Sequence, residues 1–141
     1  MVGSLLQSCS EINDKQIVRI FESHRAALDR IAKIGLSSDL SCNATDREVK
    51  CNNATAQPIF EALSREAGVK AIRARSDIPQ LGNAVYFVIA DYGFITTNSY
   101  SKGIVYSAAS LSPVVDDTQS RAEMRFRFRP IADHWYVFVM P

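Results

Sequence analysis

Three cysteines are the residues of this chain whose type and spacing point most directly to chemistry. Cys42 and Cys51 have eight residues between them, a spacing that no common zinc motif uses. A disulfide between them would close a loop of about ten residues and add roughly 2.5–3 kcal/mol to the free energy of unfolding in the chain-entropy model. Two unconnected thiols are the alternative. The disulfide, which we predict, indicates an oxidising compartment such as a periplasm or a secretory pathway.

Arg125, Arg127 and Arg129 alternate with apolar residues near the end of the chain. In a strand, this spacing places all three guanidinium groups on one face of the sheet, with consecutive members about 7 Å apart. Such a row can bind phosphate, carboxylate or an acidic partner through forked hydrogen bonds. A solvated face that protects a sheet edge against aggregation is the alternative. The row is therefore a candidate site for an anionic partner.

Tyr92 and Tyr100 fall in two stretches that we predict to be turns. Tyrosines exposed at turn tips are typical of surfaces that contact other proteins. The other tyrosines and the single tryptophan suit a pleated sheet and its core. The two turns therefore point to a protein partner rather than to a small substrate.

The sequence predicts no catalytic residue, no metal site and no cofactor. Nucleophilic catalysis needs a Ser or Cys beside a base that a third group orients. Only two histidines are present: His24 on the apolar side of a predicted helix and His134 in a predicted turn. A packed histidine and a strand-end cap are the better interpretations of these two positions. The sequence also has no Gly-x-Ser-x-Gly elbow and no glycine-rich phosphate loop.

Cys9 follows Leu5-Leu6-Gln7-Ser8, which resembles the end of a bacterial lipoprotein signal peptide. In such signals a small residue precedes the cysteine that receives lipid. The resemblance implies that residues 1–10 are the remnant of a lipoprotein signal and anchor, with Cys9 as the lipidation site. An ordinary cysteine ahead of a helix cap is the alternative.

Length and composition indicate one globular domain. The chain has 141 residues, of which 47% are hydrophobic, and a formal net charge of +1. A nearly neutral chain argues against a protein built to bind nucleic acid. Because no run of 18 apolar residues is present, we expect contact with a membrane only through a lipid on Cys9.

Hydrophobic periodicity predicts two helices in the first half. Over residues 11–35 the apolar residues repeat with a period of 3.6, with Ser8 or Ser10 as the cap and Gly35 as the stop. Residues 36–57 are polar and irregular, and residues 47–51 fit either a helical turn or a short strand. A second helix begins near Pro58, with Thr55 or Gln57 as its cap, and ends at Gly68.

From residue 69 the hydrophobic period changes to two, which is typical of strands. Turns are predicted at 91–93, 99–103 and 130–133, and a loop at 110–120. The predicted strands cover 69–75, 84–90, 94–98, 104–107, 123–129 and 135–140. We therefore expect an α+β fold: two N-terminal helices packed on a mostly antiparallel sheet of five or six strands, forming a single domain over 11–141.

The second half of the chain, about 84–141, resembles a loose group of small bacterial envelope proteins. The residues that carry the resemblance are Ser101-Lys102-Gly103, Tyr106-Ser107, Ile131 and His134-Trp135-Tyr136. The resemblance implies a lipid or membrane anchor, a helical first half and a strand-rich second half, and it carries no chemistry.

These observations favour a non-catalytic binding domain on the periplasmic side of a bacterial envelope. Its partner would be another protein or an anionic envelope component, and an inhibitor or toxin-immunity role falls within this class. The alternatives are a small enzyme or ligand-binding protein with a pocket between helix and sheet, and a cytoplasmic protein if all cysteines are free thiols.

Overall fold

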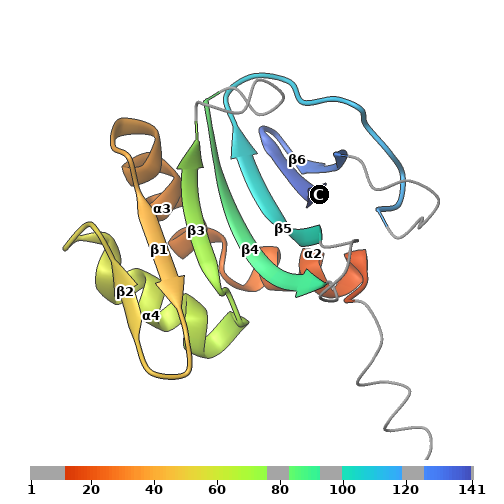
Figure 1. Cartoon of the computed structure of the whole chain (residues 1–141). Helices are drawn as coiled ribbons and strands as arrows, with labels where there is room; N and C mark the ends of the chain where they lie inside the picture. Colours follow the sequence, from red (N-terminus) through yellow and green to blue (C-terminus); the bar gives the residue numbers. More distant parts are fainter. Residues whose placement is uncertain (1–11, 76–82, 93–99, 119–125, 141) are drawn as a thin grey trace, which may run out of the picture.

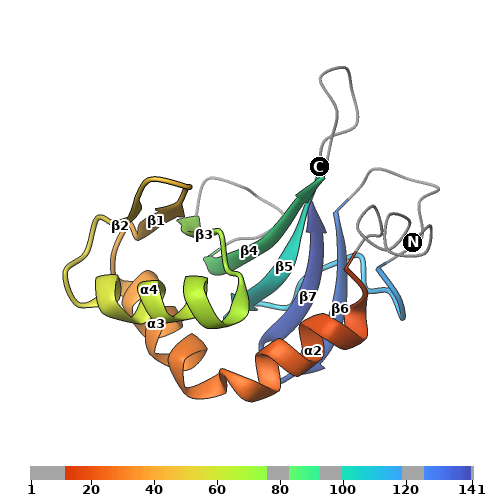
Figure 2. The same cartoon turned by 90° about the horizontal axis from the view of Figure 1, so that it is seen from below.

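Three helices cover one face of a seven-stranded sheet in residues 12–75, 83–92, 100–118 and 126–140, which the computed structural model describes (Figures 1 and 2). The helices are α2 (Asp14–Ser23), α3 (Arg25–Ser37) and α4 (Ala56–Ala67). The strands are β1 (Ser41–Ala44), β2 (Val49–Cys51), β3 (Ala71–Arg75), β4 (Ala84–Tyr92), β5 (Tyr100–Ser107), β6 (Arg127–Ala132) and β7 (Trp135–Met140). The sheet order is β2-β1-β3-β4-β5-β7-β6, and all neighbouring strands are antiparallel. The predicted α+β class is confirmed, with more helices and strands than expected.

The first predicted helix is two helices. Its cap is Asn13, whose side chain accepts a hydrogen bond from the Gln16 amide, while the Gln16 side chain accepts one from the Asn13 amide. His24 leaves the helical conformation and separates α2 from α3, and it is half-buried. Figure 2 shows the two helices following the sheet as an arc, which keeps the apolar side of each on the sheet.

Gly35 does not end the helix as predicted, because α3 continues to Ser37. It is buried, and a Cβ at this position would lie 2.5 Å from Cγ2 of Val85. The missing side chain therefore allows α3 to approach β4 closely.

The polar segment after α3 forms the β1–β2 hairpin. Thr45 closes its turn by donating its amide to the Glu48 carbonyl, 2.8 Å away. Of the two alternatives for residues 47–51, the strand is therefore correct and the helical turn is wrong. Of the two predicted caps of α4, Thr55 occupies the N-cap position, but its side chain forms no cap hydrogen bond; the Asn53 side chain accepts one from the Ala56 amide instead. Gly68 ends α4 with a φ of 73°, as predicted.

Three predicted turns change in the second half of the chain. Tyr92 belongs to β4, and Lys102 and Gly103 belong to β5, where a Cβ on Gly103 would lie 1.9 Å from the Phe87 carbonyl oxygen. The predicted strand at 94–98 lies outside the described residues. Residues 123–125 of the predicted strand at 123–129 also lie outside them, and residues 127–129 of that strand belong to β6. Pro130 is part of β6, so the turn before β7 contains only Asp133 and His134.

Both edges of the sheet are closed. At β2, the Gln57 side chain accepts a hydrogen bond from the Cys51 amide (2.7 Å) and donates one to the Val49 carbonyl (2.8 Å), as a neighbouring strand would. At β6, the Phe128 amide and carbonyl bond to the backbone of residues 113 and 115. Pro130, two residues on, has no N–H to offer. Neither edge therefore presents a free row of backbone groups for strand pairing.

Aromatic side chains fill the space between the helices and the sheet. Trp135, which is 1% exposed, contacts Phe21, Phe87 and Tyr106 with ring centroids 5.1–6.0 Å away. A smaller apolar cluster lies on the other face, around Tyr86 and Phe138. The contacts of Trp135 with Phe21 and Phe87 join α2 to the centre of the sheet.

Candidate functional site

Cys42 and Cys51 form the predicted disulfide, directly opposite each other in the hairpin. Their Cα atoms are 4.0 Å apart, and both side chains are buried in the cluster under the helices. The bridge fixes the two short strands to each other below a surface with little apolar content. Cys9 lies outside the described residues.

The side of the hairpin that faces away from the helices is polar. Because side chains alternate along a strand and Cys42 points to the helices, Ser41 and Asn43 point away from them. Lys50 lies opposite Asn43 and shares its side of the sheet. These residues border a shallow hollow of about 350 Å³, together with Thr45, Glu48, Cys51 and Asn52.

A second hollow, of about 710 Å³, adjoins the first at Ser41. Its lining includes the turn after α3, Arg73 and Asn83. Arg73 Nη1 donates hydrogen bonds to the Cys42 and Ile72 carbonyls, at 2.5 and 3.0 Å, which hold its guanidinium in place.

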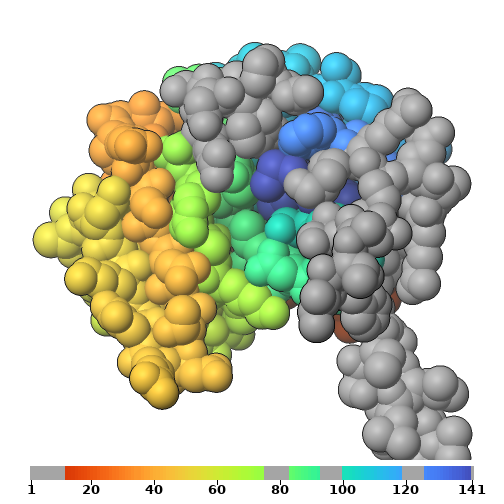
Figure 3. Space-filling model, viewed as in Figure 1, coloured from red at the N-terminus to blue at the C-terminus, as the bar shows by residue number. Residues whose placement is uncertain are grey.

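We name this area the hairpin surface: Ser41, Asn43, Lys50, Asn52 and Arg73. Figure 3 shows β1, β2 and β3, in orange, yellow and light green, at the surface on this side of the molecule. The Asn52 amide side chain accepts from the Ser41 amide and donates to the Asp39 carbonyl, which closes the base of the hairpin. The surface offers donors and acceptors on a backbone held by a disulfide.

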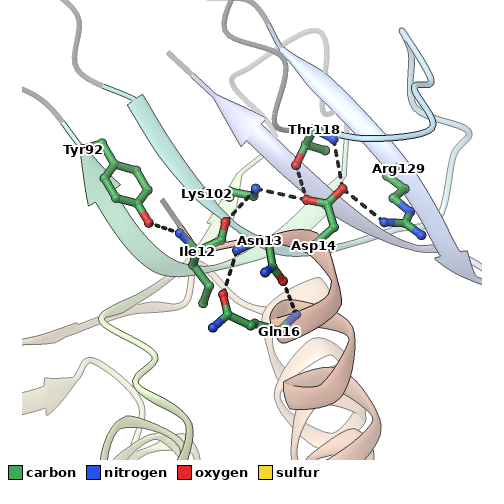
Figure 4. A network of polar contacts seen from close by, with 8 residues as sticks. All are labelled: Ile12, Asn13, Asp14, Gln16, Tyr92, Lys102, Thr118 and Arg129. Carbon is green, nitrogen blue, oxygen red and sulfur yellow. Dashed lines mark hydrogen bonds and ion pairs between the residues drawn. The ribbon is translucent and has the colours of Figure 1, made fainter. Parts of the chain in front are cut away.

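A second cluster joins the start of α2 to the sheet (Figure 4). The Asp14 carboxylate is 3.0 Å from Lys102 Nζ and 3.3 Å from Arg129 Nη1, and it accepts hydrogen bonds from the amide and hydroxyl of Thr118. Lys102 and Thr118 are 0% exposed and Asp14 is 3% exposed. Lys102 also donates to the Ile12 carbonyl, at 2.9 Å. The cluster therefore fixes the point at which the chain enters the domain.

The environment of Asp14 favours its charged form. Burial on its own would raise the pKa of this carboxyl group, but the hydrogen bonds from Thr118 and the ammonium group of Lys102 outweigh it. The pKa of Asp14 consequently lies below its ordinary value. The carboxylate is thus a structural charge, held by its partners, rather than a proton donor near neutral pH.

Arg127 and Arg129 of the arginine row lie on the face of the sheet that the helices cover. Arg127 and Arg129 lie opposite Val139 and Val137, and Val137 belongs to the core under the helices. Arg129 is bonded to Asp14, and Arg127 is half-buried. Arg125 lies outside the described residues. Arg129 therefore supports α2, and the binding of an anionic partner by the row stays a prediction.

Tyr92 and Tyr100 are not at turn tips but opposite each other at the ends of β4 and β5. Their ring centroids are 5.1 Å apart, and both residues are half-buried. The Tyr92 hydroxyl accepts a hydrogen bond from the Ile12 amide, at 2.7 Å. The structure brings this pair together with the Asp14 cluster, which sequence reasoning missed.

The two histidines lie on different elements. His134 has a φ of 67° in the β6–β7 turn, and its Nδ1 lies 3.0 Å from the Ser107 carbonyl oxygen. His24 separates α2 from α3. Among the described residues, no group of three His, Cys, Asp or Glu side chains could hold a metal ion.

Comparison with other proteins adds no assignment, because the chain matches no protein family model, no curated protein and no solved structure. The resemblance to bacterial envelope proteins therefore stays a prediction. No helix in the described part of the chain is both long and apolar enough to cross a membrane.

Proposed function

We propose that this protein is a non-catalytic binding domain on the periplasmic side of a bacterial envelope, where it recognises another protein through the hairpin surface. The observation that carries the proposal is the Cys42–Cys51 disulfide directly beneath that surface. A disulfide is compatible with an oxidising compartment. It also holds a polar surface in one conformation before a partner arrives.

A small polar surface binds a partner more tightly when its side chains and loops are already ordered in the free protein. Ordering side chains and loops on association consumes binding free energy, and a surface that is already ordered avoids that cost. The disulfide, the Arg73 hydrogen bonds and the Asn52 side chain each restrain the hairpin in the free protein. The two adjoining hollows offer places for side chains of a partner.

The proposal includes a tether. In its lipidated form the chain would be held to a membrane through Cys9, as its resemblance to a lipoprotein signal implies. An inhibitor or immunity protein fits this description, because such a protein acts by covering a partner and needs no catalytic group.

The compartment is tested by the intact mass of the protein recovered from a bacterial host. We expect a chain that starts at a lipidated Cys9 and gains about two mass units on reduction. An unlipidated chain with three free thiols would refute the envelope assignment.

The hairpin surface is tested by affinity capture from a periplasmic extract. We expect Asn43→Arg and Lys50→Glu to lose a partner that the unchanged protein retains. Glu66→Arg is the matched control, because Glu66 is exposed on α4, which covers the face of the sheet opposite to the hairpin surface. A partner that all variants retain equally would show that binding does not use this surface.

A further inference from the structure

The outer side of α2 and α3 carries an excess of positive charge. Apart from the buried Asp14, these helices carry five basic and two acidic side chains: Lys15, Arg19, Arg25, Arg30 and Lys33, with Glu22 and Asp29. Arg25 is paired with Asp29, at 3.5 Å. We name the four other basic residues, Lys15, Arg19, Arg30 and Lys33, the basic helix face.

The basic helix face is unpartnered within the described part of the chain. All four side chains are exposed, and none forms an ion pair or hydrogen bond there through its charged group. Although the whole chain has a net charge of only +1, four unpaired cationic side chains lie together on the outer side of α2 and α3. An anionic surface is the complement of such a face.

The position of this face relative to Cys9 indicates which anionic surface it meets. Cys9 is only three positions before Ile12, and an extended chain spans at most about 3.6 Å per residue. Ile12 is fixed to the domain by Tyr92 and Lys102. Lys15 and Arg19 follow within about 11 Å along the helix axis, at 1.5 Å per residue. A lipid on Cys9 would therefore keep both residues within about 22 Å of the headgroups, and a helix that lies along the membrane surface brings them within about one Debye length.

We infer that the basic helix face lies against anionic phospholipid headgroups of the membrane that holds Cys9. This inference rests on the proposed tether. It gives the domain one orientation: the helices face the membrane, and the hairpin surface, on the opposite face of the sheet, faces away from it. The proposed partner would then have free access to the hairpin.

The test attaches the purified protein to vesicles without depending on native lipidation. Cys9 is the one cysteine outside the disulfide, so a maleimide-bearing lipid couples there when no reductant is present. Vesicles of phosphatidylcholine alone are compared with vesicles that contain phosphatidylglycerol. Acetylation of lysines by a water-soluble reagent then reports which side of the domain is covered.

On the anionic vesicles we expect acetylation of Lys15 and Lys33 to fall at least threefold, while Lys50 and Lys70, which are exposed elsewhere, react as before. The fall should disappear in 1 M salt and in the double variant Arg19→Glu/Arg30→Glu, and it should persist in the α4 control Arg65→Glu. Equal labelling on both kinds of vesicle, as an acidic protein partner would give, overturns the inference. Because the lipid is attached chemically, this result is independent of whether the host lipidates Cys9.

Discussion

Lys102 and Asp14 form an ion pair whose nitrogen and oxygen are 3.0 Å apart, with both side chains removed almost completely from water. They are 88 positions apart in the chain and join the first described helix to the middle of the sheet. A buried ion pair contributes little net stability compared with apolar residues of the same size, but a buried charge without its partner is very unfavourable. The pair therefore makes the correct docking of α2 a strict condition of folding.

Removing one member of this pair should be severely destabilising. For Lys102→Met we expect the free energy of unfolding to fall by about 3–5 kcal/mol, because Asp14 keeps a buried charge with less compensation. Urea unfolding measures the change. Lys70→Met, at an exposed position, should stay within about 0.5 kcal/mol of the unchanged protein.

A double-mutant cycle separates this effect from lost packing. Asp14→Asn combined with Lys102→Met should cost clearly less than the sum of the two single variants. Simple additivity would mean that the two charges do not interact.

Stability should decrease in acid through Asp14. Its pKa in the folded protein lies below the ordinary value of 3.8, so folding favours the ionised form. The resulting stabilisation is complete above the pKa of the unfolded chain and is lost as the pH falls through the folded-state pKa. Urea midpoints measured from pH 6 downward should therefore fall less steeply for Asp14→Asn than for the unchanged protein. Identical pH profiles for the two proteins would contradict this assignment, and Asp29→Asn, at a half-exposed surface pair, serves as the control.

Gln57 should keep the β2 edge from pairing with other chains. Gln57→Leu leaves the Cys51 amide and the Val49 carbonyl without their side-chain partner. We expect a loss of about 1–3 kcal/mol and concentration-dependent self-association, measured by light scattering after gel filtration. Glu66→Leu adds the same apolar side chain to the same helix and should remain monomeric. If both variants associate equally, added hydrophobicity rather than the open edge is the cause.

Gly35→Ala should destabilise the protein although alanine is the better helix former. In the absence of contacts, the change would gain about 1 kcal/mol through helix propensity. Here the new methyl group meets Val85 at 2.5 Å, so we expect a net loss of about 1–3 kcal/mol in thermal or urea unfolding. Adding Val85→Ala should recover part of that loss, and a failure to recover any would place the cause outside this contact.

Local patterns predicted the parts of the fold that depend on neighbours in sequence. The apolar stripe of the first helices, the strand at β4 and the Cys42–Cys51 pairing all follow from spacing within a few residues. The sequence places Lys102 and Gly103 in a turn because glycine readily adopts the positive φ of a turn. In the structure both residues belong to β5 because of contacts with residues far away in sequence. Lys102 pairs with the Asp14 carboxylate, and Gly103 leaves room for the Phe87 carbonyl.

The candidate sites show the same limit. Alternation correctly predicted that Arg127 and Arg129 share one face of a strand, opposite to Phe128. It contained no information on which face the helices cover, so the contact from Arg129 to Asp14 was missed. Thr118 is separated from Asp14 by 104 positions, and no pattern in either segment links them.

The Asp14 cluster also sets an order of events during synthesis. A ribosome produces Asp14 early, whereas Thr118 and Arg129 are added 104 and 115 residues later. Until then the Asp14 carboxylate lacks two of its partners, and α2 lacks the contacts that hold it against the sheet. The docking of α2 on the sheet is therefore completed only after the last strands of the sheet have been synthesised.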